Sequence, residues 1–582
     1  MADQEKLPVY VSEHISDNYN WDIVVAFDIG TSYSGYAYSD RKQIKENKIN
    51  LNEWIGNFSH DKTAKAPSIV LLNEDRSFNS FGYEAEANYA KMVQDKTHHK
   101  CYRFCNFKMR LYHEKSINET FEIQEDGGKR KIPAIDIFAH IIRVLKGHFQ
   151  NTIERRGSVY KSKNVLYVLT VPAIWSESAK QFMRKAAIKA DLAEYQILLA
   201  LEPEAAALYC RELQKHMVTS AFEPGTKYMV LDMGGGTIDI VVHKIMEDKT
   251  LAEVYKASGG DWGGNIVDAE FKAFVTGLFK NEECIDKLWE IAPRDALDFE
   301  REFEAKKRQI SCNTSLDDIR LQIPNRLKMF ANTEIQNQGK SMTLEHIYVD
   351  QTQFQGFFKT SKEEIIRIIE KIIGEVGAIE LILLVGGFSC STFLREEIIK
   401  YFAFSNIRII SPPERSTVVL KGAVIFGYNP CAVSARICRY TYGIGILEPF
   451  DSKKHPQRKR AIIDGKEMCK NVFHVLAYKD EIVKYNEEKT FKSISRHRNK
   501  NRKFVSITIE LYQAKNVRED QLAFVTDEGF MFIGQIVCMP PENGWPDRVD
   551  LITKIYFGQT SIRIENYDTA NKEQIKASFE LD

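Results

Sequence analysis

Residues 228–243 combine residue types that suit phosphate and metal chemistry. They read YMVLDMGGGTIDIVVH: an apolar run ends at Asp232, a glycine-rich turn follows, and Asp239 leads into a β-branched run. The turn contains Gly234, Gly235, Gly236 and Thr237. Glycine lets backbone amides approach a ligand closely, and amides pointing into a turn form an anion site. Two aspartates beside the turn suit a hydrated Mg²⁺, which keeps several of its waters. The pattern indicates a loop for phosphate and magnesium; a structural hairpin with a bulge is the alternative.

A second copy of this pattern lies much earlier in the chain. Asp28 in VVAFDIGTS aligns with Asp232 in MVLDMGGGT, and Gly30 aligns with Gly234. The separation far exceeds the period of a solenoid repeat, which is about 20–50 residues, so it indicates a duplicated domain. Two such hairpins facing each other across a cleft would hold a polyphosphate from both sides.

Strands and helices alternate around these two hairpins. Apolar runs predict strands at residues 21–29, 165–171, 196–201 and 380–385. Helical spacing and N-cap residues such as Ser176 predict helices at residues 134–149, 176–190, 202–209, 294–310 and 361–373. The alternation is typical of an α/β architecture with a largely parallel sheet.

The two ends of the chain differ from residues 21–430. Residues 1–20 form a predicted polar tail, whereas residues 431–582 contain short β-rich runs that predict an all-β region. Basic runs at 453–460 and 495–503 separate some of these strands. We interpret them as solvated loops, because no RNA-binding signature accompanies them, and we expect no nucleic-acid partner.

Composition points to an intracellular protein. Lys plus Arg and Asp plus Glu each number 80, so the net charge gives no general attraction to nucleic acid or anionic membrane. The 10 cysteines form no CxxC pair, which favours reduced thiols. The N-terminus does not resemble a signal peptide, and no apolar run approaches the ~18 residues of a membrane span. We expect a cytoplasmic location, with access to the nucleus left open.

The motifs and their order resemble the nucleotide-binding domain of the heat-shock-seventy chaperones, within the actin, sugar-kinase and heat-shock ATPase superfamily. The two phosphate loops of this chain read DIGTSYSG and LDMGGGTID, and both resemble the phosphate loops of the chaperones. Further segments that resemble the chaperones are TVPAIWSES, LEPEAAAL, GGDWGGNIVD and the adenosine loop LLVGGFS. The resemblance covers about residues 21–430 and is strongest to the divergent protein-twelve branch of that family. It implies an actin-like ATPase fold, in which two RNase H-like lobes surround a nucleotide cleft. Residues 431–582 then resemble a reduced substrate-binding domain without a helical lid.

The resemblance also implies roles for individual residues, with ATP or ADP and Mg²⁺ as cofactors. The metal and its waters would be ordered by Asp28, Asp232 and Asp239. The phosphates would be held by Gly30, Thr31, Ser32, Tyr33, Gly234, Gly235, Gly236 and Thr237. The backbone would approach the nucleotide at Gly263, Gly264, Gly386 and Gly387. Catalysis would involve Lys108 in FCNFKMRL, Glu202 and Asp232; an ordinary surface lysine is the alternative for Lys108.

The run EAKKRQIS adds an adenosine-binding face to the resemblance. Its four polar residues at i, i+3, i+4 and i+7 share one side of a helix; they are Glu304, Lys307, Arg308 and Ser311. In the chaperones this face holds the ribose and base, which implies the same role here. A solvated charged helix would show the same spacing.

The sequence departs from the chaperone pattern at several positions. Phe388 and Cys390 stand where the chaperones carry a Ser and an Arg that stacks on adenine, so we expect Phe388 to stack instead. Leu201 and Glu204 replace an Asn and a Thr in LEPEAAAL. The join CAVSARICRYTYGIGI replaces a leucine-rich acidic linker, which weakens the expectation of the same coupling between domains.

Three functions remain open from the sequence. The first is an ATP-binding heat-shock-seventy-like protein with weak Mg-dependent ATPase activity and protein or peptide partners, an atypical chaperone. The second is a nucleotide-gated scaffold with little turnover. The third is a small-molecule kinase of the same superfamily, against which the match in EAKKRQIS argues.

Overall fold

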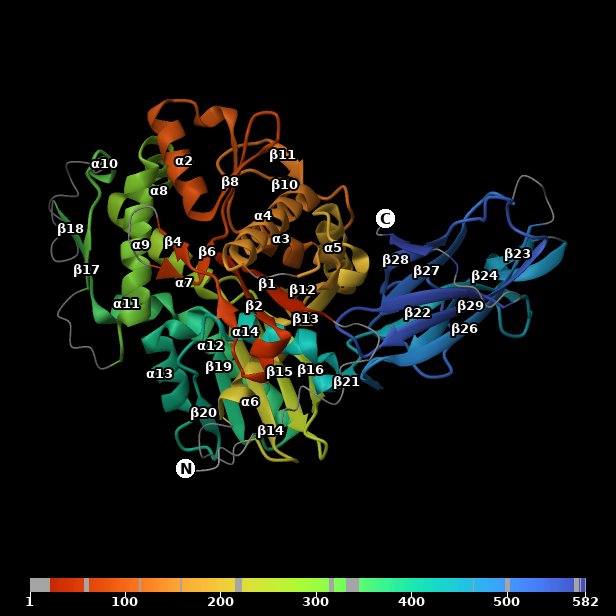
Figure 1. Cartoon of the computed structure of the whole chain (residues 1–582). Helices are drawn as coiled ribbons and strands as arrows, with labels where there is room; N and C mark the ends of the chain where they lie inside the picture. Colours follow the sequence, from red (N-terminus) through yellow and green to blue (C-terminus); the bar gives the residue numbers. More distant parts are fainter. Residues whose placement is uncertain are drawn as a thin grey trace.

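The computed structural model describes most of the chain. Described are residues 21–56, 62–114, 117–157, 160–214, 222–312, 319–330, 345–463, 465–497, 503–569, 575 and 577–580. The predicted polar tail at residues 1–20 lies outside the described residues. Figure 1 shows a large α/β body and, to its right, a β-rich body that the chain forms last.

The first large sheet carries the hairpin that contains Asp28. Its strand order is β13-β12-β1-β2-β3, and β6 also pairs with β2. β1 is parallel to β12 and antiparallel to β2, and Asp28 is registered opposite Gly35. β1 and β12 are buried along their whole lengths because both are apolar on both faces. The bounds are β1 (Ile23–Ile29), β2 (Tyr33–Asp40), β3 (Asn50–Leu51), β6 (Lys65–Pro67), β12 (Val165–Val171) and β13 (Ile197–Leu201).

The second large sheet carries the hairpin that contains Asp232. Its order is β20-β19-β14-β15-β16-β21-β25. β14 is antiparallel to β15, with Asp232 opposite Asp239, and parallel to β19. The bounds are β14 (Lys227–Met233), β15 (Ile238–Ile245), β16 (Leu251–Gly260), β19 (Leu381–Val385), β20 (Arg408–Ile410), β21 (Val433–Ile437) and β25 (Ile482–Lys484). The expectation of a largely parallel sheet is wrong, because each sheet joins an antiparallel hairpin to parallel crossover strands.

Helices α6 (Glu202–Gln214) and α14 (Val418–Tyr428) lie between the two sheets (Figure 1). They pack closely, because Gly422 has no side chain and the backbone of Ala205 lies against it. One buried apolar cluster therefore joins residues of both sheets through these helices. The predicted N-cap Ser176 is confirmed, since its hydroxyl accepts a hydrogen bond of 3.1 Å from the N–H of Ala179.

Further helices surround the two sheets. Their bounds are α2 (Gly82–Gln94), α3 (Lys108–His113), α4 (Ala134–Arg155), α5 (Glu177–Lys189), α7 (Gly264–Phe279), α8 (Cys284–Ile291), α9 (Pro293–Gln309), α11 (Gln351–Phe357), α12 (Lys359–Val376) and α13 (Thr392–Tyr401). The helices predicted at residues 134–149, 176–190, 294–310 and 361–373 correspond to α4, α5, α9 and α12. None of the described helices has both the length and the apolar content needed to cross a membrane.

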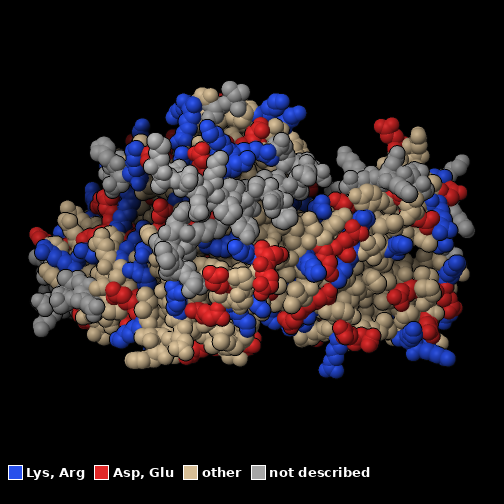
Figure 2. Space-filling view, turned by 60° about the horizontal axis from the view of Figure 1, so that its bottom comes forward, with Lys and Arg blue, Asp and Glu red and all other residues tan. Residues whose placement is uncertain are grey.

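The β-rich body consists of two sheets that share an apolar core. One has the order β23-β24-β22-β27-β28-β31 and the other β26-β29-β30. The bounds are β22 (Thr441–Pro449), β23 (Arg460–Ile463), β24 (Lys466–Ala477), β26 (Glu487–Arg496), β27 (Ile507–Ala514), β28 (Phe530–Cys538), β29 (Arg548–Phe557), β30 (Arg563–Asp568) and β31 (Ala577–Glu580). Figure 2 shows one face of the whole molecule, and acidic and basic side chains intermingle over it.

The predicted domain boundary near residue 430 falls just before a shared sheet edge. β21 pairs with β16 of the second large sheet, and β25 pairs with β21, although both strands follow residue 430. One edge of the second large sheet is therefore formed by strands from the C-terminal part of the chain.

Candidate functional site

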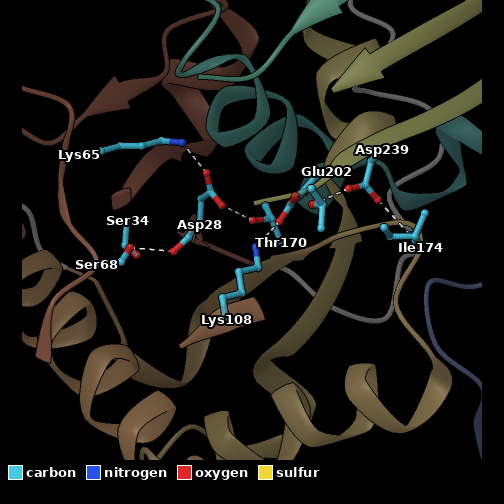
Figure 3. Close-up of polar contacts among 11 residues, drawn as sticks. Asp28, Ser34, Lys65, Ser68, Lys108, Thr170, Ile174, Glu202 and Asp239 are labelled. Atoms are coloured by element: carbon cyan, nitrogen blue, oxygen red, sulfur yellow. Dashed lines mark hydrogen bonds and ion pairs between the residues drawn. The ribbon is translucent and has the colours of Figure 1, made fainter. Parts of the chain in front are cut away.

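Six charged side chains meet where the two hairpins approach each other. The carboxylates belong to Asp28, Glu202, Asp232 and Asp239, and the ammonium groups to Lys65 and Lys108. Asp28 and Asp232 lie near the ends of β1 and β14, and Glu202 begins α6 directly after β13. β1, β12 and β13 are parallel and end at the same edge of the first sheet, which brings Asp28 close to Glu202, and Figure 3 shows both beside Lys108 and Asp239.

Asp28 is held by two partners. The ammonium group of Lys65 lies 2.5 Å from Oδ2, and the hydroxyl of Thr170 donates a hydrogen bond of 2.9 Å to Oδ1. Burial alone would raise the pKa of Asp28, but the ammonium groups of Lys65 and Lys108 hold it below its ordinary value. Asp28 is therefore an ionised and fully paired carboxylate.

Lys108 and Glu202 form a second ion pair, with 2.7 Å between Nζ and Oε1. Lys108 is only 5% exposed, so it is not a surface lysine. Its ammonium also lies 5.5 Å from the ring centroid of Trp175. Burial, together with the nearby Asp28 and Asp239, raises the pKa of Glu202 to about 7. Lys108 was predicted to sit beside the transferred phosphate, and that role stays a prediction.

Asp239 and Asp232 stand opposite each other in the second hairpin. Asp239 accepts hydrogen bonds from the N–H of Ile174 (3.0 Å) and the hydroxyl of Thr237 (2.9 Å). Within the described residues, Asp232 has no hydrogen-bond or ion-pair partner, although it is only 6% exposed. Burial first, then the neighbouring carboxylates of Glu202 and Asp239, raises its pKa well above the ordinary value. Asp232 is thus the carboxylate of the site that has no ion-pair partner among the described residues.

Gly386 shows why the loop after β19 needs glycine. Its φ is +85°, and a Cβ there would overlap the carboxylate of Asp232 and lie 2.5 Å from the carbonyl oxygen of Met233. Gly387 is different, because a Cβ on it would meet nothing within 4 Å. The loop therefore lies against Asp232 at Gly386 and has open space beside it at Gly387.

The two glycine-rich loops face each other at contact distance. A Cβ on Gly236 would lie 2.7 Å from the hydroxyl of Thr31, and one on Gly235 would overlap the hydroxyl of Ser32. A Cβ on Gly263 would lie 2.6 Å from the carbonyl oxygen of Gly235. The structure thus brings together the predicted phosphate-binding residues of both loops.

The start of α7 fixes the second loop. The N–H groups of Gly263, Gly264 and Asn265 donate to the carbonyls of Gly236, Gly234 and Gly235, at 3.1, 3.2 and 2.8 Å. In the described part of the chain, the N–H groups of Gly235 and Gly236 themselves have no acceptor. Gly30 and Gly234 complete the turns, each lying against the backbone of the residue three positions later, Tyr33 or Thr237. The loop therefore presents free amide donors, as an anion site requires.

The predicted adenosine face is built on α9. Lys307 is 5% exposed and pairs with Asp268 (2.6 Å) and Glu304 (2.5 Å), while Glu304 also pairs with Arg308 (2.7 Å). The guanidinium carbon of Arg308 lies 6.0 Å from the ring centroid of Tyr33 in the first loop. α9 therefore reaches the first hairpin through a charged side chain.

Two expectations at the adenosine end need correction. Ser311 does not share the helical face, because α9 ends at Gln309 and Ile310 is extended. Phe388 is 5% exposed and stacks on Phe358 at 6.2 Å, beside Gly264, so it has no exposed ring face for a base. For Ser311 and for the partly exposed Cys390, a position near the adenosine end of the site stays a prediction.

Sequence reasoning missed several groups at the site. Lys65 carries no recognisable motif and reaches Asp28 only through the pairing of β6 with β2. Thr170 had a signal, as the polar residue in the apolar strand VLYVLTV. Arg395, beside the adenosine loop, donates a hydrogen bond of 3.1 Å to the carbonyl of Ser389. The contacts of Lys65 and Thr170 with Asp28 could not be predicted, because 37 and 142 positions separate the partners in the sequence.

Comparison with known families identifies the class of protein. Residues 73–428, more than half of the chain, match the family described as Hsp70 protein. The chain belongs to the Hsp70 family, and its α/β body has the actin-like ATPase fold of that family.

Named relatives extend the similarity beyond that region. The chain is 28% identical to Heat shock 70 kDa protein 12A of Homo sapiens over 98% of its own length and 93% of the relative. The identity to the protein 12A of Mus musculus is also 28%, with the same coverage. Heat shock 70 kDa protein 12B of Homo sapiens is 29% identical over 97% of this chain and 91% of the relative.

Proposed function

We propose that the protein binds ATP between the two hairpins, hydrolyses it weakly with Mg²⁺, and couples the nucleotide to protein or peptide partners. The observation that carries this proposal is the contact between the two glycine-rich loops beside Asp28, Asp232 and Lys108. Free amide donors suit the phosphates, and membership of the Hsp70 family supports the nucleotide. Residues 21–430 would form duplicated lobes around the nucleotide, and residues 431–582 would contact the partner.

The charges at the site fit a divalent cation. Its carboxylates outnumber its lysines by two, and Asp232 is the one without a partner among the described residues. The described residues hold no cluster of three or more side chains that would ligate a metal directly. Mg²⁺ commonly keeps its waters and contacts few carboxylates, so Asp232 and Asp239 would hold it through water. Bound Mg²⁺ would neutralise charge on the phosphates.

The remaining groups have roles that follow from their positions. Lys108 would stabilise the negative charge that develops on the transferred phosphate. Glu202, whose pKa is raised to about 7 by burial, is suited to orient the attacking water and to accept its proton. Thr31, Ser32 and the amides of Gly235 and Gly236 would position the phosphates in line with that water.

Contacts across the join support coupling to the C-terminal region. Arg436 of β21 forms a buried pair with Glu204 (2.6 Å) and also donates to the carbonyl of Gly558. Arg439 donates to the carbonyl of Ala173 at 3.1 Å, beside Ile174, whose N–H holds Asp239. The join therefore touches both α6, which carries Glu202, and the segment that fixes Asp239.

All 10 cysteines are free, which supports a location in the reducing cytoplasm.

A nucleotide-gated scaffold with little turnover is the second candidate. It is favoured by the pairing of Asp28 with Lys65 and Thr170, because each carboxylate oxygen of Asp28 already accepts a hydrogen bond. In this case the nucleotide would set the shape of the protein rather than drive a cycle.

Phosphate release from radiolabelled ATP by the purified full chain separates the two candidates. The assay is run with Mg²⁺ and with or without an unfolded peptide, and nucleotide binding is measured in parallel. Release that the peptide stimulates supports the ATPase. Nucleotide binding without release supports the scaffold, whereas no binding of ATP or ADP contradicts both.

A further inference from the structure

Lys65 is a cation at the site to which the proposed function gives no role. It lies on β6, paired opposite Gly35 of β2. A Cβ on Gly35 would lie 3.0 Å from Cγ of Lys65, so the lysine side chain crosses the bare face of that glycine. Gly35 is in turn registered opposite Asp28. The glycine therefore opens the path along which the lysine reaches the carboxylate.

The ion pair between Lys65 and Asp28 is sheltered but not sealed. The side chains are 18% and 7% exposed, and Nζ lies 2.5 Å from Oδ2 (Figure 3). Thr170 donates to Oδ1, so each oxygen of this carboxylate already accepts one hydrogen bond. Among the described residues, Asp232 of the opposite hairpin forms no ion pair, and it faces Asp239 rather than a glycine.

The ammonium group has capacity left for a ligand. A lysine carries three N–H donors, and in the described part of the chain Asp28 is its acceptor. Two donors therefore remain for a ligand, on a residue whose strand pairs with β2 directly after the first phosphate loop. Ammonium groups bind phosphate oxygens as point charges, and such charge-assisted bonds are about twice as strong as neutral ones.

We propose that Lys65 is a built-in cation of the nucleotide site, which neutralises Asp28 and donates to a phosphate oxygen, so that nucleotide binding depends little on Mg²⁺. This inference rests on the proposed function and concerns the same site. Lys65 supplies one positive charge at the first loop, and the divalent cation is needed only at Asp232. A nucleoside diphosphate or triphosphate would therefore bind in the absence of metal.

A purely structural ion pair is the alternative. In that case Lys65 would serve only to neutralise Asp28, and its removal would change stability without changing how binding depends on Mg²⁺. The ratio of dissociation constants without and with metal separates the two interpretations, because it cancels a uniform loss of affinity.

The test is equilibrium binding of ATP and ADP to the full chain by isothermal titration calorimetry, in Mg²⁺ and in EDTA. We expect the wild type to lose less than about tenfold in affinity in EDTA, or about 1.4 kcal/mol. Lys65→Met keeps much of the aliphatic side chain and removes the charge, and its loss in EDTA should be at least about tenfold larger. Lys65→Arg keeps the charge and should behave like the wild type.

The matched control is Lys62→Met. Lys62 is an exposed lysine on β5 (Lys62–Thr63), shortly before Lys65 in the sequence, and it pairs with Glu53. Its ratio should equal that of the wild type. Equal ratios for Lys65→Met and the wild type would overturn the inference. Loss of wild-type binding in EDTA would also overturn it, whether or not Lys65→Met folds, and would leave the proposed function intact. A wild type that binds neither nucleotide in Mg²⁺ would overturn both.

Discussion

The two hairpins share their sequence pattern but differ in their charge balance. Asp28 has a lysine and a hydroxyl as partners and a lowered pKa, whereas Asp232 has no such partner among the described residues and a raised pKa. The difference comes from neighbouring strands rather than from the loops. Beside Asp28, β12 supplies the hydroxyl of Thr170; beside Asp232, β19 supplies Val385, which cannot donate.

The residue opposite each aspartate completes the difference. Asp28 faces Gly35, which leaves room for Lys65, whereas Asp232 faces Asp239. Like charges directly opposite each other in an antiparallel pair are destabilising. A duplicated pattern can thus give one hairpin whose aspartate, Asp28, is neutralised by a lysine, and a charged half, the hairpin whose aspartate, Asp232, is not. In our proposal, only the charged half needs an added cation.

Replacing Asp232 should produce the largest effect. If the proposed function holds, Asp232→Asn is expected to lower ATP turnover by about 100-fold, because the carboxylate proposed to hold the cation is lost. Single-turnover phosphate release measures this. Asp261→Asn, at an exposed carboxylate in the loop before α7, is the control and should retain turnover. Full activity of Asp232→Asn would show that Asp232 does not hold the metal.

Stability without ligands should separate the two aspartates. Asp28→Asn leaves Lys65 without its partner and should lower the free energy of unfolding by about 2 kcal/mol, less than for a fully buried pair because Lys65 is partly exposed. Asp232→Asn removes an unpaired buried charge and should not lower it. Urea unfolding, followed by circular dichroism, measures both variants. Equal losses in the two would contradict the difference between the halves.

The pH dependence of stability should reflect the charged half. Burial raises the pKa of Asp232 and also that of Glu202, the latter from 4.5 to about 7. A raised folded-state pKa gives stability that is present at low pH and lost as the pH rises through it. Without Mg²⁺, Glu202 alone should therefore lower the free energy of unfolding by about 3 kcal/mol as the pH rises through the window from 4.5 to about 7, and Asp232 acts in the same direction.

The lowered pKa of Asp28 acts in the opposite sense: its contribution is lost only as the pH falls through the folded-state value, below this window. Urea titrations at several pH values measure the dependence, and the difference between the wild type and Asp232→Asn cancels groups elsewhere. A difference that does not vary as the pH rises above 3.8, the ordinary value for an aspartate, would refute the raised pKa of Asp232.

Exchanging the neighbouring strand residues should produce the smallest effects. Thr170→Val removes the hydroxyl from Asp28 and should cost about 1 kcal/mol in the free energy of unfolding. Val385→Thr offers Asp232 a donor, so it should change that free energy by less than about 0.5 kcal/mol but flatten its pH dependence. If Val385→Thr leaves the pH dependence unchanged, the neighbouring strand is not the cause of the difference.

Local sequence was sufficient for the strands, the loops and the aspartates of this site. An apolar run ending in Asp and glycine specifies β1 and β14 without information from elsewhere. The partners of these aspartates could not be predicted, because Lys65 and Thr170 reach Asp28 through tertiary pairing of β6 and β12. Ser311 was misplaced for a local reason, since the polar spacing continues past the end of α9. Phe388 was misplaced because burial against Phe358 is a tertiary fact.

The last strand of the second large sheet affects how the protein can be made. β25 (Ile482–Lys484) forms the edge beyond β21, although β14 of the same sheet begins at Lys227. Synthesis proceeds from the N-terminus, so both glycine-rich loops leave the ribosome long before that sheet is complete. Until then β16 has an open edge, and Glu204 waits without Arg436. A nascent chain therefore acquires its finished nucleotide-binding body only after much of the C-terminal region has been translated.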